Sequence, residues 1–293
     1  MKKKYALVAL TVVSITLGGM WSAVSQPATG FAPRTLVEPV LPLKQVQRDD
    51  GIDPEALIER ILLMEKKQRD AVNDLVLDAE YVEGEEKDGE FREKVRFIKK
   101  IYVRYLPDTA FFHEDYLEYY KDGKQRSDKD RDKEAKKRKE NKRKRNTKDI
   151  SFSMLDPFYP DNRQYYEIAY EGVTEDPVEG YVCHHFTVIS LEEDSERING
   201  DFYFEAESFN LVRVEFAPAK LVRKTMFKMN EMNMSITYGT TEENIWLPRQ
   251  FDIFGKGKAM FFIGVKFAGT EYYRNPVING GIDEKIFEEE NGR

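Results

Sequence analysis

The sequence predicts a mainly β protein with helices (α+β), in which one large antiparallel sheet has its apolar face covered by an N-terminal amphipathic helix. Segments of the second half alternate apolar and polar residues, most clearly Met232, Met234, Ile236 and Tyr238 against Asn233, Ser235 and Thr237. Because successive strand side chains point to opposite faces, such segments give a sheet one apolar face and one polar face. The chain has one cysteine, so core packing rather than crosslinking must stabilise this fold.

The first residues predict export. Lys2, Lys3 and Lys4 precede an apolar run from Tyr5 to Leu17, and Ala23-Val24-Ser25 provides a small-x-small cleavage pattern. We therefore expect a signal peptide over residues 1–25. The alternative, a retained membrane anchor, needs roughly 18 to 20 apolar residues, more than this run has. No cysteine lies near the cleavage pattern, so the lipobox of bacterial lipoproteins is missing. We expect an exported, periplasmic protein that is soluble after cleavage.

The mature chain is expected to form one domain over residues 52–293. Residues 26–51 contain Pro27, Pro33, Pro39 and Pro42 and no periodicity, which is typical of a disordered leader. Asp53 then supplies an N-cap and Pro54 a first helical residue, which predicts a helix over 54–72. Its apolar side carries Leu57, Ile58, Ile61, Leu62 and Met64.

Period-two patterns and turn residues then predict the strands. They span residues 74–83, 90–105, 110–120, 162–170, 180–192, 197–206, 210–217, 225–238, 245–255 and 258–273. Gly255-Lys256-Gly257 is interpreted as a hairpin turn, and Pro276 with Asn279-Gly280-Gly281 is expected to end the sheet. Residues 282–289 predict a last amphipathic turn that packs Ile286 and Phe287.

A basic insertion is expected at about residues 121–149. The formal charge of the chain is -7, yet Lys121 to Lys148 holds 15 Lys and Arg against 6 Asp and Glu, so this segment carries +9 and the rest -16. One interpretation is a solvated, partly disordered insertion; the other is an electrostatic dock for an anionic membrane surface or an acidic partner. Export and the lack of interleaved aromatic residues argue against nucleic acid. The candidate contacts are Lys136, Lys137, Arg138, Lys139, Lys142, Arg143, Lys144 and Arg145.

Catalytic signatures are weak. The adjacent His184 and His185 would point to opposite faces of a strand, which argues against a shared metal ion. The chain has no nucleophile elbow, zinc-binding helix, phosphate loop or dinucleotide fingerprint. We expect a protein that is not an enzyme and needs no cofactor or metal, with Cys183 as a buried structural thiol.

The order of an export signal, a long helix and a meander of antiparallel strands resembles the periplasmic lipoprotein-carrier fold of LolA-type carriers and outer-membrane lipoprotein-sorting proteins. The local likeness lies in Phe202 to Val214, in Asn244 to Gln250 and in Tyr272-Tyr273-Arg274. The resemblance implies a strongly curved half-barrel with helices as a lid over a cavity that shelters acyl chains. The lid candidates are Leu57, Ile61 and Met64.

The period-two faces would supply the cavity wall. The candidates are Phe97, Ile101, Met232, Met234, Ile236, Phe251, Phe261, Ile263 and Phe267. The alternative is that these side chains form an ordinary closed core against the helix. The expected function is a carrier or chaperone for lipid or lipoprotein acyl chains, and the alternative is a non-enzymatic sensor or protein-binding module of the same fold.

Overall fold

The computed structural model describes residues 51–87, 90–106, 110–145, 156–221, 223–224, 227–259 and 263–288. The expected signal peptide and the leader up to residue 50 lie outside the described residues. Within these ranges, no helix is both long and apolar enough to cross a membrane.

One antiparallel sheet joins twelve strands of the described chain in the order β4-β3-β2-β1-β12-β11-β10-β8-β7-β6-β5, with β9 paired to β10. The strands are β1 (Asp74–Lys87), β2 (Glu90–Tyr105), β3 (Ala110–Lys121), β4 (Lys124–Gln125), β5 (Tyr166–Val173), β6 (Cys183–Ser190), β7 (Ile198–Glu205), β8 (Leu211–Pro218), β9 (Arg223–Lys224), β10 (Phe227–Thr240), β11 (Trp246–Ala259) and β12 (Ile263–Ile278). The helices are α2 (Pro54–Asp70), α3 (Asp128–Arg145), η2 (Asp156–Phe158), α4 (Pro160–Arg163) and α5 (Lys285–Glu288). The mainly β, antiparallel prediction is confirmed.

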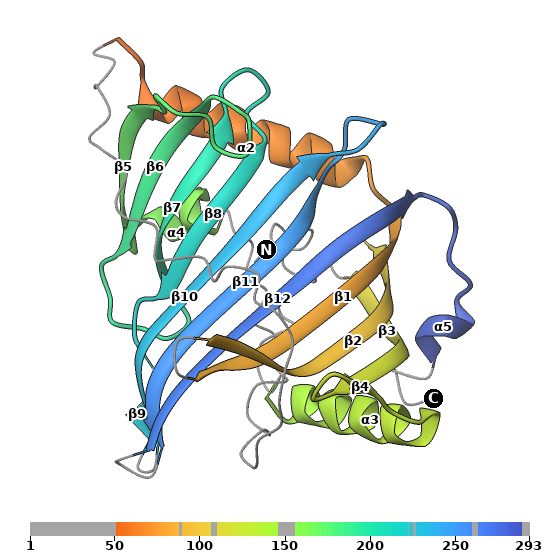
Figure 1. Cartoon of the computed structure of the whole chain (residues 1–293). Coiled ribbons are helices and arrows are strands. Elements are labelled where there is room, and N and C mark those ends of the chain that lie inside the picture. Colours follow the sequence, from red (N-terminus) through yellow and green to blue (C-terminus); the bar gives the residue numbers. More distant parts are fainter. Residues whose placement is uncertain are drawn as a thin grey trace.

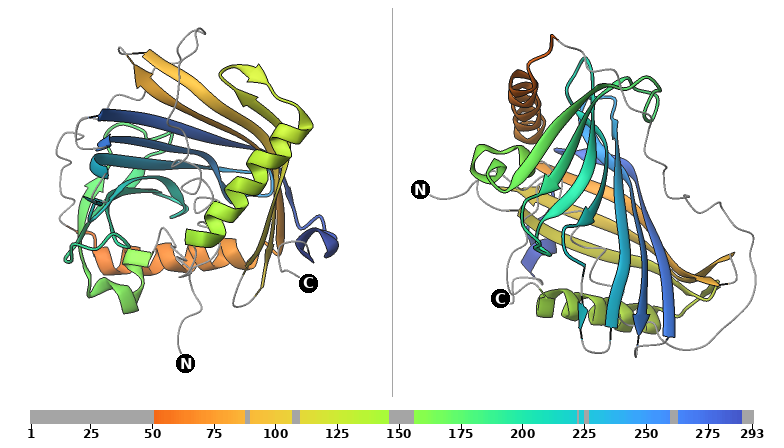
Figure 2. Two further views of the ribbon diagram at one scale, coloured as in Figure 1. Left: turned by 90° about the horizontal axis from the view of Figure 1, so that it is seen from below. Right: turned by 90° about the vertical axis from the view of Figure 1, so that its left-hand side faces the viewer.

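The sheet is open and strongly curved, and α2 and α3 lie on its inner side (Figures 1 and 2). Register shifts in β1 between Val76 and Asp78, and in β10 between Met229 and Glu231, mark β-bulges. A bulge bends its strand and increases the local twist, so these positions help the long strands to curl.

Helix α2 covers the end of the sheet where β1 begins. Its N-cap is Asp53, whose carboxylate accepts a hydrogen bond of 3.0 Å from the Glu55 N–H, and Pro54 follows as predicted. Leu57, Ile58 and Ile61 are buried in the main hydrophobic cluster of the sheet. The expected helical cover therefore packs directly on the apolar face.

The glycines of β11 correct one prediction. Gly255-Lys256-Gly257 is not a turn: all three residues lie inside β11 and pair with β10 on one side and β12 on the other. A Cβ at Gly255 would lie 2.1 Å from Cζ of Phe267, and one at Gly257 would lie 2.6 Å from the Lys228 carbonyl oxygen. Both glycines are there because neighbouring atoms approach the backbone closely.

The predicted strand over 162–170 is wrong at its start. Pro160 opens the short helix α4, because proline is well suited to the first helical position, and β5 begins only at Tyr166. At the other end of the chain, β12 includes Pro276 and ends at Ile278, and Asn279 follows with a positive φ of 53°.

Candidate functional site

The inner face of the curved sheet is the candidate site, and its side chains fall into cross-strand rows. One row runs through Phe97, Tyr81, Glu271, Phe251, Ile236, Val214, Phe202, Phe186 and Tyr170. Every member except Glu271 is apolar or aromatic. Two further rows lie along β10, β11 and β12, at increasing distance from α2. The first includes Ile253 and Met234. The second includes Phe267, Gly255 and Met232.

The register places the described cavity-wall candidates on this face, although some of their strands are far apart in sequence. Phe97, Ile101, Ile236 and Phe251 are 0–1% exposed, and Met234 is also buried. These five residues are therefore packed as in an ordinary closed core, which was the alternative to a cavity wall. Met232 and Phe267 differ, because they pack against the main cluster and yet are only half-buried. Phe261 lies outside the described residues, and Ile263 is placed only by its backbone pairing with Ala259.

The lid candidates lie on the side of α2 that faces the sheet. Leu57 and Ile61 are buried in the core, and Met64 is half-buried. Side-chain hydrogen bonds also fasten this helix: Gln68 donates to the Asn244 carbonyl (3.2 Å) and accepts from the Trp246 N–H (3.0 Å). Helix α2 is thus held on the sheet both by apolar packing and by the hydrogen bonds of Gln68.

A layer of buried charge crosses the inner face between α2 and α3, and sequence reasoning missed it. Nζ of Lys99 lies 2.5 Å from Glu114 and 2.6 Å from Glu271, and the three residues are at most 3% exposed. The Tyr116 hydroxyl donates to Glu114 (3.0 Å), and the Tyr273 hydroxyl donates to Glu271 (3.1 Å). The available signal was that Lys99 interrupts the apolar alternation of Val95, Phe97, Ile101 and Val103.

Electrostatics follows from this packing. Burial lowers the pKa of Lys99, but the attraction of Glu114 and Glu271 outweighs burial and the net shift is upward. Burial also raises the pKa of the Tyr116 and Tyr273 hydroxyls well above their usual range. Lys99 is therefore held as a cation between two carboxylates, and both hydroxyls remain donors.

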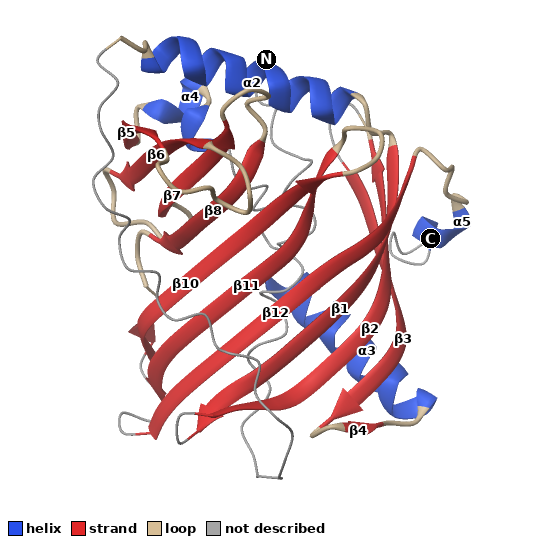
Figure 3. Cartoon of the chain, turned by 45° about the horizontal axis from the view of Figure 1, so that its top comes forward, coloured by secondary structure: helices blue, strands red, loops and turns tan. Residues whose placement is uncertain are grey.

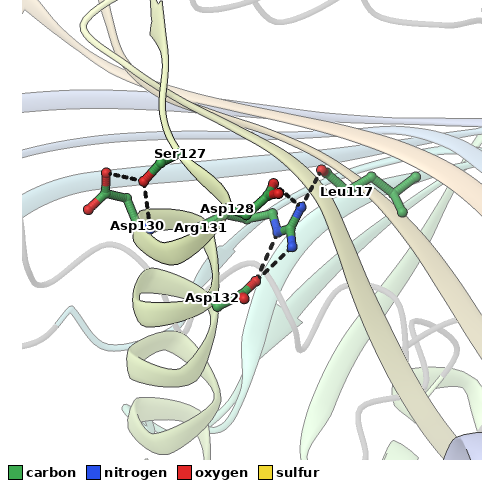
Figure 4. Close-up of polar contacts among 6 residues, drawn as sticks. All are labelled: Leu117, Ser127, Asp128, Asp130, Arg131 and Asp132. Carbon is green, nitrogen blue, oxygen red and sulfur yellow. Dashed lines mark hydrogen bonds and ion pairs between the residues drawn. The ribbon is translucent and has the colours of Figure 1, made fainter.

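Helix α3 forms where the sequence predicted an insertion, and it crosses the inner side of the sheet (Figure 3). The partly disordered alternative is therefore wrong for residues 128–145. Ser127 is the N-cap, accepting from the Asp130 N–H (3.3 Å) while its hydroxyl donates to the Asp130 carboxylate (2.7 Å). Arg131 donates to the Leu117 carbonyl (3.0 Å) and to Asp128 (2.8 Å), which ties the first turns of α3 to β3 (Figure 4).

The charge order of the tract explains why it is helical without an apolar face. Its acidic residues begin in the first turn with Asp128 and Asp130, and its last turns are basic, which complements the helix dipole at both ends. Glu134 also pairs with Lys137 and Arg138, both at 3.7 Å. The sequence signal that could have located α3 is the capping pattern Ser127-Asp128-Lys129-Asp130.

The basic-contact candidates are not equivalent. Lys136 and Lys137 are exposed, and Lys139 is half-buried. Arg138 is buried against the sheet, where it pairs with Glu83, so it is not available to an anionic surface. Lys142, Arg143, Lys144 and Arg145 belong to the last turns of α3, and their side chains lie outside the described part of the structure.

His184, His185 and Cys183 lie on β6, away from this layer. His184 contacts the Tyr170 hydroxyl (2.9 Å), whereas His185 contacts Asp201 (2.8 Å), so the adjacent rings have separate partners. Within the described ranges, no group of three or more His, Cys, Asp and Glu residues could hold a metal ion. Cys183 is fully buried, as predicted, and burial raises the pKa of its thiol to about 12.

No family model matches the chain, and no curated protein matches it. Three similar solved structures are a DUF1329 family protein from Desulfovibrio piger, a putative outer membrane lipoprotein-sorting protein domain from Vibrio parahaemolyticus and a LolA superfamily protein from Nitrosomonas europaea. The first has a TM-score of 0.44 and 12% identity and covers 82% of this chain and 99% of its own. The second has a TM-score of 0.38 and 12% identity, with 80% and 98% covered. The third has a TM-score of 0.32 and 7% identity, with 82% and 100% covered.

These structures include the lipoprotein-sorting and LolA-type proteins that the sequence resembles. What this chain binds has to be argued from its own residues.

Proposed function

We propose that the protein is an exported, non-enzymatic carrier that binds the acyl chains of a lipid or lipoprotein on the inner face of its sheet. The observation that carries this proposal is the row of Phe267, Gly255 and Met232. It continues the buried core along β10, β11 and β12, but its apolar side chains keep accessible surface. An acyl chain laid along this row would extend the core rather than open it.

The free energy available is large enough. Burial of a methylene group contributes roughly 0.8 kcal/mol, so about a dozen methylenes removed from water contribute about 10 kcal/mol. The row has features suited to such a guest: Met232 is a flexible side chain that adapts to irregular surfaces, and Gly255 adds no side chain beside it. The Phe267 ring lies close to the backbone of Gly255, so this row offers an aromatic surface for contact with the acyl chain.

The proposal is tested first by extracting lipid from the purified exported protein and identifying it by mass spectrometry. Titration with a fluorescent fatty acid or a lipopeptide then measures uptake. A charge in the apolar row should oppose binding, so Met232→Asp is expected to weaken uptake at least about tenfold. The matched control is Asn233→Asp, because Asn233 is exposed and points to the opposite face.

Saturable uptake by the parent and Asn233→Asp proteins, lost in Met232→Asp, would support the carrier. A folded parent protein with no saturable uptake would overturn it and leave the protein-binding sensor as the function to test.

A further inference from the structure

The guanidinium group of Arg138 lies over the rings of Phe97 and Tyr81, and we call these two rings, with the residues that surround them, the cage. The central carbon of the guanidinium group is 4.7 Å from the ring centroid of Phe97 and 5.4 Å from that of Tyr81. Tyr119 stacks on Phe97 with 4.8 Å between centroids, and Tyr116 meets the same ring edge-on at 5.1 Å. All four aromatic residues are buried and come from β1, β2 and β3. The faces of Phe97 and Tyr81 attract the guanidinium because they carry partial negative charge, while Tyr119 and Tyr116 hold Phe97 in place.

The cage also contains a carboxylate. Glu83 is buried, and its Oε2 accepts hydrogen bonds from the Tyr81 hydroxyl (2.9 Å) and from Nη2 of Arg138 (3.3 Å). Glu114 and Glu271 share Lys99. Of the described cations, Arg138 is the one paired with Glu83. The cage therefore needs an occupant that is cationic and that also donates a hydrogen bond.

Helix α3 carries Arg138, and the helix itself makes little apolar contact with the sheet. Of its described side chains, Ala135 is the hydrophobic residue that packs against the aromatic cluster. The hydrogen bond from Arg131 to Leu117 holds the helix near its start, seven residues before Arg138. Among the described side chains of α3, Arg138 is inserted into the cage and Ala135 makes the apolar contact, so withdrawal of Arg138 breaks no large apolar interface of these residues.

We propose that this cage is a binding site for the guanidinium group of an arginine in a partner polypeptide, and that Arg138 occupies it until a partner displaces it. The geometry favours guanidinium over a quaternary ammonium group, because only the former can donate to Glu83 while stacking on Phe97 and Tyr81. The cage lies on β1, β2 and β3, whereas the proposed acyl-binding row lies on β10, β11 and β12; the two adjoin where Phe267 pairs with Glu85, two residues after Glu83.

The test compares binding of N-acetyl-arginine amide to the parent protein and to Arg138→Ala by calorimetric titration. An internal occupant reduces apparent affinity by the fraction of time that the cage is empty. Arg138→Ala is therefore expected to bind this probe at least about tenfold more tightly than the parent. The added change Tyr81→Leu should abolish the gain, and N-acetyl-lysine amide should bind more weakly than the arginine probe.

Equal affinities of the parent and Arg138→Ala would overturn the proposal, and equal binding of the two probes would overturn its guanidinium selectivity. If Arg138→Ala does not fold, Arg131→Ala replaces it. This variant keeps the cage and Arg138 but loosens α3, so the arginine probe should bind several-fold more tightly than to the parent. An unchanged affinity in this variant would also overturn the proposal. Fatty-acid uptake, measured on each variant without the arginine probe, distinguishes failure of this proposal from failure of the proposed carrier function.

Discussion

Glu271 and Lys99 form an ion pair inside the sheet, with 2.6 Å between Oε1 and Nζ, and both side chains are almost wholly buried. Glu271 stands in a cross-strand row that is otherwise apolar or aromatic, beside Phe251 and Tyr81. Lys99 comes from the other half of the strand meander and also neutralises Glu114. Lys99 of β2 therefore links to β12 through Glu271 and to β3 through Glu114.

Replacing Lys99 should be strongly destabilising. Lys99→Met leaves Glu114 and Glu271 buried without their cation, and removal of one partner of a buried ion pair costs about 3–5 kcal/mol. Denaturant unfolding measures this change. Lys100→Met is the matched control, since its side chain is 39% exposed and pairs with Asp78 at 3.3 Å; its effect should stay within about 0.5 kcal/mol. Equal effects of the two substitutions would show that the buried pair contributes little.

Cys183 should make the fold sensitive to alkaline pH. Its folded pKa is raised from 9.0 to about 12, because burial disfavours the thiolate. The folded state therefore retains the proton, and this stabilisation is complete below pH 9 and is lost as the pH rises from 9 toward 12. At pH 10 the parent should have lost about 1.4 kcal/mol more than Cys183→Ala, each relative to its own stability at pH 8. Equal losses of unfolding free energy in the parent and in Cys183→Ala would show that the Cys183 thiol does not cause the alkaline sensitivity.

The exposed lysines of α3 should affect surface binding without affecting the fold. If α3 docks on an anionic membrane, the double substitution of Lys136→Gln and Lys137→Gln should weaken binding to anionic vesicles by about 1 kcal/mol per lysine. Unfolding free energy should be unchanged within about 0.5 kcal/mol. Arg138→Gln should lower the unfolding free energy and leave vesicle binding unchanged, because the charge of Arg138 is directed at Glu83 and not at the surface. Vesicle sedimentation that does not respond to the lysine substitutions would remove the membrane role.

Tryptophan insertions should separate the packed core from the accessible row. Ile236 is fully buried, so Ile236→Trp overpacks the core and should cost roughly 1–3 kcal/mol. Met232 is half-buried, so Met232→Trp should cost less while it reduces fatty-acid uptake. Melting temperature and uptake, measured on both variants, test this difference. A larger stability loss for Met232→Trp than for Ile236→Trp would show that the row is already closed.

Strand pattern was the most predictable feature of this chain. The alternation of Met232, Met234, Ile236 and Tyr238 correctly placed β10, because one face of the sheet is buried and the pattern has to follow it. Gly255 and Gly257 were misread, because glycine is usual in turns and only the neighbouring Phe267 ring and Lys228 carbonyl reveal why a strand needs it.

The candidate site was less predictable, because its key contacts join distant segments. Lys99 and Glu271 are far apart in sequence, and nothing local to either indicates the other. Arg138 belongs to a tract whose composition is typical of a solvated segment, and its burial depends on the ring of Phe97 and the carboxylate of Glu83. Period-two patterning places a side chain on a face but does not tell a packed core from an accessible row.

Site mapping with a photoreactive fatty acid tests the carrier account most directly. After irradiation of the complex, the modified peptides are identified by mass spectrometry, with competition by unlabelled fatty acid to confirm saturable binding. Fragmentation of these peptides locates the modified residue, and the account predicts adducts on Met232 and Phe267 themselves and their loss in Met232→Asp. Saturable adducts confined to the outer face, for example at Asn233 and Lys256, or no saturable labelling of the folded protein, would contradict it.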